Sequence, residues 1–178
     1  MSVAISVLVL PGHGNSGPQH WQTLWERHHP DWRRVDLGHW DSPVCDDWVH
    51  ALDLAVRACP APPLLVAHSL ACLLVAQWAH RSALALKGAF LVAVPDPQSA
   101  CFPATARGFV PAPMEPFAFR SLVVASANDP FGSLAHAKDC ATAWGSSFVD
   151  IGEAGHINAD SGHGEWTEGY ALFQQFIA

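Results

Sequence analysis

The sequence predicts an α/β fold built on a doubly wound parallel sheet. Short apolar runs of strand type alternate along the chain with segments whose apolar residues have helical spacing, and this alternation is typical of parallel α/β sheets. Polar loops follow most of the apolar runs, at the strand ends where such sheets bind ligands. The length of 178 residues, half of them hydrophobic, fits a single domain with a full core.

The first half of the chain is predicted to contain three strands and three helices. Residues 3–10 form a continuous β-prone run, as expected of a central strand covered on both faces. A helix is expected from Pro18 to about His28, because proline suits a first helical turn and the apolar residues after it have helical spacing. The other expected elements are a strand at 33–37, a loop at 38–44, a helix at 46–59, a strand at 64–67 and a helix from 70 to about 80.

The second half continues the alternation with a strand at 87–94. Six prolines between Pro95 and Phe119 exclude a long helix or a central strand there, so a loop with at most one short helix is expected. The remaining expected elements are a strand at 121–125, a helix at 133–144, a strand at 147–151 and a helix at 165–177.

Composition and charge exclude several classes of protein. The net charge of −7 and the absence of any basic cluster beyond Arg33-Arg34 disfavour binding to nucleic acids or anionic membranes. No apolar run approaches the ~20 residues of a membrane span, and no basic segment marks a signal peptide. Five widely spaced cysteines without a C-x-x-C pair argue against a disulfide framework and a structural zinc site. We therefore expect a soluble cytoplasmic protein.

A serine stands between the strand at 64–67 and the helix after it. The segment Ala67-His68-Ser69-Leu70-Ala71 has the frame of a nucleophile elbow, G-x-S-x-G, in which small flanking residues permit a tight turn that exposes the serine hydroxyl. Alanine replaces both glycines here, so the motif alone is degenerate. A serine that merely caps a helix is the structural alternative.

A nucleophilic serine needs a base and a carboxylate that orients the base. His156 is the preferred base and Asp129 the preferred acid, because each lies in a turn after its own strand and the chain order Ser, Asp, His is that of α/β-hydrolases. Asp96 is the rival acid. The rival bases are His163 and His68, of which His68 is expected to shape the elbow or hydrogen-bond nearby.

The remaining site residues are predicted from their loops. The oxyanion needs two N–H donors, for which we expect the backbone amides of Leu70, just after the nucleophile, and of His13, in the loop after the first strand. Trp40, Pro43 and Phe131 are candidates for an apolar acyl pocket, although they could equally pack loops over the sheet.

Three other functions remain open at this stage. Gly12-x-Gly14-x-x-Gly17 follows a strand, and Asp36 ends the next, which matches the fingerprint of a Rossmann-type dinucleotide-binding protein; Asn15 to Pro18, however, has the composition of a loop. The 11 histidines raise the possibility of a metal hydrolase, but no H-E-x-x-H occurs. A catalytically silent binding module would tolerate replacement of Ser69.

Five separated motifs resemble those of one family, the small serine hydrolases of the YdeN and retinoblastoma-binding serine hydrolase type. In order they are Pro11-Gly12…Ser16-Gly17-Pro18…His20-Trp21, Trp40…Pro43…Trp48, His68-Ser69-Leu70-x-Cys72, Ser126-x-Asn128-Asp129-Pro130 and Gly155-His156-Ile157-Asn158…Ser161-Gly162-His163-Gly164-x-Trp166.

This resemblance implies a minimal α/β-hydrolase, a three-layer α/β/α sandwich without a large lid, with strand order 2-1-3-4-5-6. It also implies the triad Ser69, Asp129 and His156, acting on a small ester, thioester or amide without a cofactor or metal. Ala71 is a mild departure from the family's elbow. No cysteine is followed by Glu two positions later, so the pocket-protein motif L-x-C-x-E is absent and no such partner is expected. The oligomeric state stays open.

Overall fold

A single parallel sheet organises the computed structural model, which describes residues 5–178; Val3 and Ala4 of the predicted first strand lie outside that range. The strand order β2-β1-β3-β4-β5-β6 is the predicted one, and every neighbouring pair is parallel. The strands are β1 (Val7–Leu10), β2 (Arg33–Arg34), β3 (Leu64–His68), β4 (Gly88–Val92), β5 (Ser121–Ala125) and β6 (Ser147–Asp150).

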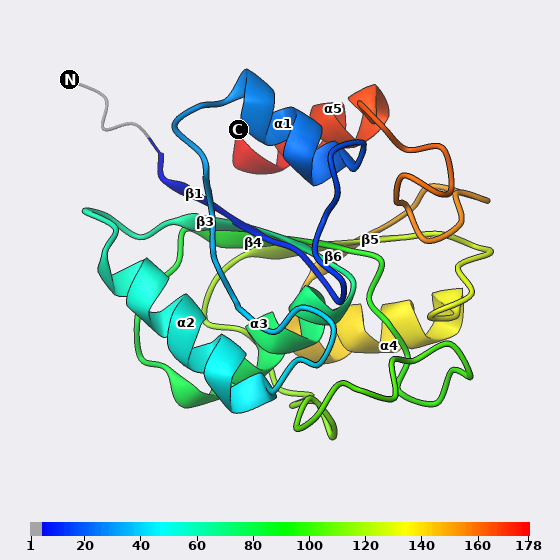
Figure 1. Cartoon of the computed structure of the whole chain (residues 1–178), viewed down its shortest axis with the longest axis horizontal. Helices are drawn as coiled ribbons and strands as arrows, with labels where there is room; N and C mark the ends of the chain where they lie inside the picture. The colour runs from blue at the N-terminus through cyan, green and yellow to red at the C-terminus, as the bar shows by residue number, and fades with distance from the viewer. Residues whose placement is uncertain (1–4) are drawn as a thin grey trace.

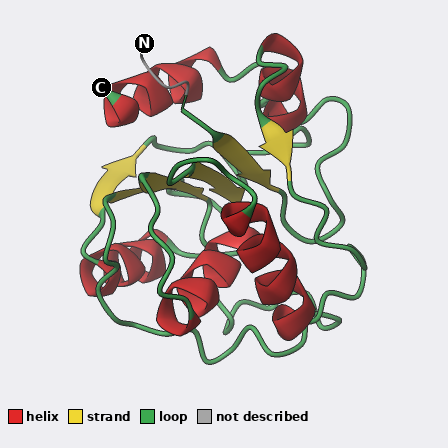
Figure 2. Ribbon diagram, turned by 90° about the vertical axis from the view of Figure 1, so that its left-hand side faces the viewer, coloured by secondary structure: helices red, strands yellow, loops and turns green. Residues whose placement is uncertain are grey.

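Helices cover both faces of the sheet, so the predicted three-layer α/β/α architecture is confirmed. Figure 1 shows α1 (Trp21–His28) and α5 (Thr167–Ile177) above the strands, and α2 (Cys45–Arg57), α3 (Leu70–Arg81) and α4 (Leu134–Trp144) below them. Figure 2 shows the same two layers of helices from the side.

Two hydrophobic cores follow from the period-two alternation of the strands. In β3, Leu64 and Val66 face the α1 and α5 layer, whereas Leu65 and Ala67 face α2, α3 and α4. Both sets are fully buried, as are all residues of β1, β3, β4 and β5. A strand buried on both faces needs apolar residues at every position, which is why these runs read as continuous in the sequence.

Several element boundaries differ from the predicted ones. Helix α1 begins at Trp21 rather than Pro18, because the His20 imidazole caps it by accepting a hydrogen bond from the Gln22 amide. Strand β2 has two residues and not five, as an edge strand can. Residues 95–119 contain no helix or strand, in line with their prolines. Among residues 5–178, no helix is long and apolar enough to cross a membrane.

Candidate active site

Ser69 lies at a sharp turn between β3 and α3, at the carboxyl edge of the sheet. Its φ of 56° and ψ of −126° fall in a region that residues other than glycine rarely adopt. Two backbone hydrogen bonds hold the turn: the Ser69 amide donates to the Val92 carbonyl at 2.9 Å, and the Cys72 amide donates to the Ser69 carbonyl at 2.8 Å. The hydroxyl is thereby raised above the sheet edge, as in a nucleophile elbow.

The loop after β1 packs directly against this turn through Gly12. A Cβ atom built at Gly12 would lie 2.9 Å from both the His68 carbonyl oxygen and the Ser69 Cβ, and 3.3 Å from the Leu70 nitrogen. No side chain fits at those distances without a shift of the backbone. Gly12 is therefore required for the close approach of two loops, a reason that involves no dinucleotide.

The structure brings together the three residues singled out as a triad. His156 Nε2 lies 2.8 Å from Ser69 Oγ, and His156 Nδ1 lies 2.9 Å from each carboxylate oxygen of Asp129. A carboxylate can only accept, so Nδ1 carries the proton and Nε2 of the neutral ring accepts the Ser69 hydroxyl proton. The side chains of Asp129 and His156 are only 3% and 8% exposed. This arrangement can deprotonate the serine.

Two residues that sequence reasoning assigned no role tie the acid loop to the base loop. Asn128 Oδ1 accepts from the Gly155 amide at 2.7 Å and from Ser126 Oγ at 3.0 Å, and Ser126 Oγ accepts from the Ala154 amide at 2.9 Å. These bonds fix the loop that carries Asp129 relative to the loop that carries His156. Their only signal in the sequence is the Ser126-x-Asn128-Asp129 motif.

The rival residues lie elsewhere or contact the site differently. Asp96 accepts from the Gln98 amide at 2.8 Å and faces His136 at 3.8 Å. His163 lies in the loop before α5, with its Nδ1 3.4 Å from Ser161 Oγ. His68 is buried and donates from Nε2 to the His156 carbonyl at 2.9 Å, which agrees with the hydrogen-bonding part expected of it and links the elbow to the base loop.

Two backbone amides near the serine are the predicted oxyanion donors. The Leu70 amide opens α3, where the N-terminal end of the helix dipole favours negative charge, and the His13 amide follows Gly12. Neither amide donates to another protein atom among residues 5–178. The His13 side chain contacts two other loops, with its Nε2 3.2 Å from the Asp41 carbonyl oxygen and 3.0 Å from Thr105 Oγ1. The side chain thus braces the loop while its amide stays available.

A pocket of about 350 Å³ opens above Ser69 and His156. Phe131, one of the three predicted pocket residues, lines it, and its ring lies 4.1 Å from that of His156. Trp40 and Pro43 are not among its lining residues: Trp40 packs on Trp48, with the ring centres 5.6 Å apart, and the Pro43 carbonyl accepts from Arg107. The other lining residues are His13, Asn15, His20, His68, Cys101, Pro103 and Asn158.

Two buried imidazoles on this wall are neutral. Burial lowers the pKa of His20 to about 3, with smaller contributions from Arg34 and His156. Burial likewise holds the pKa of His68 well below its usual value, with His20 and His156 adding to the effect. Neither ring therefore carries a charge that would compete with the one that forms on His156 when it takes a proton.

The other site types find little support in the geometry. The glycine-rich loop ends well before α1, since Gly17 lies four residues ahead of Trp21, whereas a dinucleotide site needs the helix to begin among the glycines. Within residues 5–178, no group of three or more His, Cys, Asp or Glu side chains is arranged to hold a metal ion.

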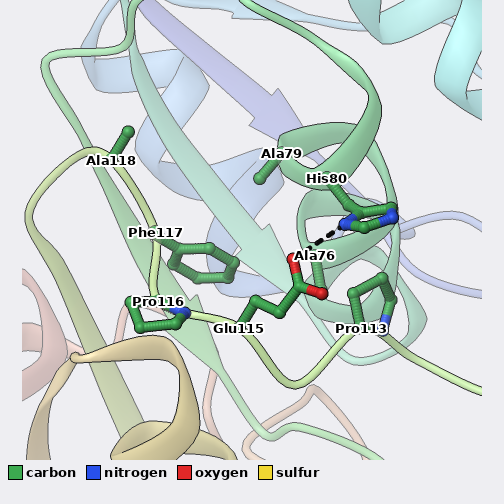
Figure 3. A pocket seen from close by; sticks show the side chains of 8 residues that line it. All are labelled: Ala76, Ala79, His80, Pro113, Glu115, Pro116, Phe117 and Ala118. Carbon is green, nitrogen blue, oxygen red and sulfur yellow. Dashed lines mark hydrogen bonds and ion pairs between the residues drawn. The ribbon is translucent and has the colours of Figure 1, made fainter.

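A smaller pocket of about 100 Å³ lies at the C-terminal end of α3, away from Ser69 (Figure 3). Its polar wall is an exposed pair, His80 Nδ1 and the Glu115 carboxylate 2.9 Å apart. The rest of the lining is alanine, proline and one phenylalanine. It holds no nucleophile and therefore offers no second hydrolytic site.

Comparisons with known proteins bear on the family and the fold. A family model described as serine hydrolase matches residues 7–175. A protein described as a YdeN-like hydrolase from Pectobacterium atrosepticum is 32% identical, with a TM-score of 0.86 over 97% of this chain and 90% of that one. The ydeN gene product of B. subtilis is 20% identical, with a TM-score of 0.82 over 97% and 98%.

More distant structures share the fold. A thermophilic esterase from Thermogutta terrifontis is 14% identical, with a TM-score of 0.71 over 99% of this chain and 92% of that one. The type II thioesterase BorB of the borrelidin biosynthetic cluster is also 14% identical, with a TM-score of 0.68 over 100% and 94%. No curated protein sequence matches the chain.

Proposed function

The chain belongs to the serine hydrolase family, and from this premise we propose that it hydrolyses a small ester, thioester or amide through an acyl-enzyme on Ser69. The observation that carries the proposal is the unbroken hydrogen-bond chain from Ser69 Oγ through His156 to Asp129, with links of 2.8 and 2.9 Å. The strained backbone of Ser69 supports it, because such strain persists where the surroundings impose it and is common at active sites.

Acylation begins with the proton on Ser69. His156 Nε2 takes this proton as Oγ forms a bond to the carbonyl carbon of the substrate. The carbonyl oxygen becomes an oxyanion and accepts hydrogen bonds from the amides of Leu70 and His13, a type of stabilisation worth about 10²–10³ in rate for one donor. Asp129 stays ionised, keeps the Nδ1 proton in place and stabilises the imidazolium.

The second half of the reaction returns the proton. His156 donates it to the leaving oxygen, sulfur or nitrogen as the bond from that atom to the acyl carbon breaks. A water molecule then attacks the acyl-enzyme while His156 accepts its proton, and Ser69 recovers its hydrogen as the carboxylic acid leaves. The chemistry needs no redox partner, and every group that moves a proton belongs to the chain.

The substrate is proposed to be small. The pocket of about 350 Å³ is near the lower end of the range for small-molecule sites, and Phe131 gives it an apolar wall beside His156. We include in the proposal that the chain forms one catalytic domain, since both cores pack against the same sheet. We also include that it acts in the cytoplasm, since its five cysteines are free thiols, as is usual in a reducing compartment.

A fluorophosphonate probe tests the nucleophile. The wild-type protein should be labelled at Ser69 and should hydrolyse p-nitrophenyl acetate, and Ser69→Ala should lose both activities. Ser42→Ala, which changes an exposed serine of the loop before α2, serves as the matched control and should keep both.

Three results would contradict the proposal. Labelling that persists in Ser69→Ala would place the nucleophile elsewhere. Absence of labelling and hydrolysis in the wild type would favour the catalytically silent binding module. Tight binding of NADH would favour the dinucleotide-binding protein.

A further inference from the structure

The pocket above Ser69 adjoins a second hollow of about 380 Å³. The two share the lining residues His13, Asn15, His20 and Asn158. The second hollow extends between the β1–α1 loop, from His13 to His20, and the segment that follows His156, where Asp160 is exposed. A substrate attached to Ser69 thus has room to extend into it.

Asn15 offers only hydrogen-bond donors to this space. Its Oδ1 accepts from the Ser16 amide at 2.8 Å and from Arg34 Nη1 at 3.1 Å. Both partners are donors, so the orientation of the amide group is determined and its oxygen is occupied. The NH₂ group has no acceptor among the described residues.

The side-chain amide of Asn158, in the segment after His156, is held in the same way. Its Oδ1 accepts from the Ser161 amide at 3.0 Å and lies 3.0 Å from Ser161 Oγ. The backbone donor again determines which end of the side-chain amide is the oxygen. Its NH₂ group is likewise without a protein acceptor within residues 5–178.

His20 adds a third donor at the junction of the two hollows. Its Nδ1 accepts from the Gln22 amide at 3.2 Å, and the ring is neutral because burial lowers its pKa to about 3. The proton of the neutral ring is therefore on Nε2. That atom is buried and is the one buried side-chain polar atom of the described residues without a hydrogen-bond partner, in a residue only 6% exposed.

We propose that the second hollow is a substrate subsite for an uncharged carbonyl oxygen, such as that of an amide, held by the unpaired donors of Asn15, His20 and Asn158. This inference rests on the proposed function, since it concerns the substrate of the same serine. The buried Nε2 of His20 calls for an acceptor, because an unpaired buried donor costs free energy that a ligand oxygen would recover. The NH₂ groups of Asn15, which is exposed, and of Asn158, which is half-buried, offer further donors to the same oxygen.

The charges in the hollow favour a neutral group over a carboxylate. None of the described side chains that line it is a lysine or arginine, His20 is neutral, and Asp160 is acidic. Arg34 contacts the Oδ1 atom of Asn15 and not its NH₂ group, and the same guanidinium is also bound by Glu26. A carboxylate would lose its hydration without gaining a cation as its partner.

Paired nitrophenyl esters test the subsite. In one series the acyl chain ends in a dimethylamide, a carboxylate or an isopropyl group; in a second series the same three groups stand on the alcohol of an acetate ester. The two series cover both directions in which an ester can lie across Ser69. In one of them the wild type should show kcat/KM about tenfold higher for the dimethylamide than for the isopropyl ester, the effect of one or two net hydrogen bonds.

Asn158→Asp and Asn15→Asp are the decisive variants. Each keeps the acceptor oxygen that binds Ser161 or Ser16 but replaces the donor NH₂ by a second carboxylate oxygen. The kcat/KM ratio of the dimethylamide ester to the isopropyl ester should therefore fall several-fold towards one in each variant. Gln175→Glu, an exposed change on α5 with the same difference in charge, should leave the ratio as it is in the wild type.

The outcomes separate the two proposals. A wild-type ratio near one in both series, a preference for the carboxylate ester, or variants that slow both esters equally would overturn the subsite. If the wild type hydrolyses no ester of either series, the proposed function itself fails.

Discussion

Asp129 and Asp96 follow neighbouring strands, and only their surroundings tell them apart. The side chain of Asp129 is 3% exposed and contacts His156 Nδ1 with both oxygens, while the Phe131 amide donates to Oδ1 at 2.8 Å. The side chain of Asp96 is 25% exposed and faces His136. A carboxylate orients a base only through direct contact, so the geometry favours Asp129.

Replacement of Asp129 by asparagine should therefore cost far more than the same change at Asp96. In Asp129→Asn the amide can donate to Nδ1, so the imidazole proton moves to Nε2 and the ring no longer accepts from Ser69. We expect kcat for a nitrophenyl ester to fall by about 10³–10⁴, as loss of the correct tautomer does in serine proteases.

Asp96→Asn provides the matched control for that measurement. It should change kcat by less than about threefold, since surface carboxylates contribute little to rate. A normal rate in Asp129→Asn together with a large loss in Asp96→Asn would assign the acid to the other strand.

At the scale of elements, the elbow between β3 and α3 depends on a second element that touches it. The β1–α1 loop passes so close that a Cβ at Gly12 would meet Ser69 and His68 at 2.9 Å. Gly17, in the same loop, has open space around its Cα and no positive φ. The structure therefore has no room for a side chain at Gly12, whereas it has room for one at Gly17.

Alanine substitutions should expose this difference. Gly12→Ala should lower the free energy of unfolding by about 1–3 kcal/mol, the usual cost of overpacking, and should slow fluorophosphonate labelling because Ser69 must shift. Gly17→Ala should stay within about 0.5 kcal/mol of the wild type. Urea unfolding and labelling rates measure both effects, and equal losses from the two variants would contradict the packing argument.

At the scale of the whole molecule, two neutral histidines are buried at the seam between the elbow and α1. His20 and His68 pack with ring centres 4.7 Å apart, and His68 lies 6.0 Å from Trp21. Burial lowers both pKa values from the usual 6.5, that of His20 to about 3 and that of His68 well below its usual value. Below pH 6.5 these two histidines bind protons in the unfolded chain but stay neutral in the native chain, for His20 down to about pH 3.

Stability should consequently fall as the solution becomes acidic. The free energy of unfolding decreases by about 1.4 kcal/mol per pH unit for each such histidine below pH 6.5, a loss that for His20 continues to about pH 3. His20→Asn keeps an N-cap oxygen for α1 but removes this titration. Urea unfolding at pH 7 and pH 5 should show a smaller difference for His20→Asn than for the wild type, and an unchanged difference would contradict the assignment.

The sequence by itself determined the order of strands and helices, the burial of the central strands and the family. These properties depend on local patterns: apolar runs, helical spacing, prolines between residues 95 and 119, and the polar motifs at the strand ends. The sequence did not predict boundaries such as the start of α1, because the N-cap residue there is a histidine rather than one of the usual N-cap residues.

Only the tertiary structure decided which side chains meet. His156 reaches Asp129 across 27 residues and Ser69 across 87, and no local pattern encodes distances of that kind. The tertiary structure likewise separates Phe131, which lines the pocket, from Trp40 and Pro43, and it shows that the oxygens of Asn15 and Asn158 are already occupied. The physical reason is that a loop's conformation follows from what packs against it, and its partners come from other strands.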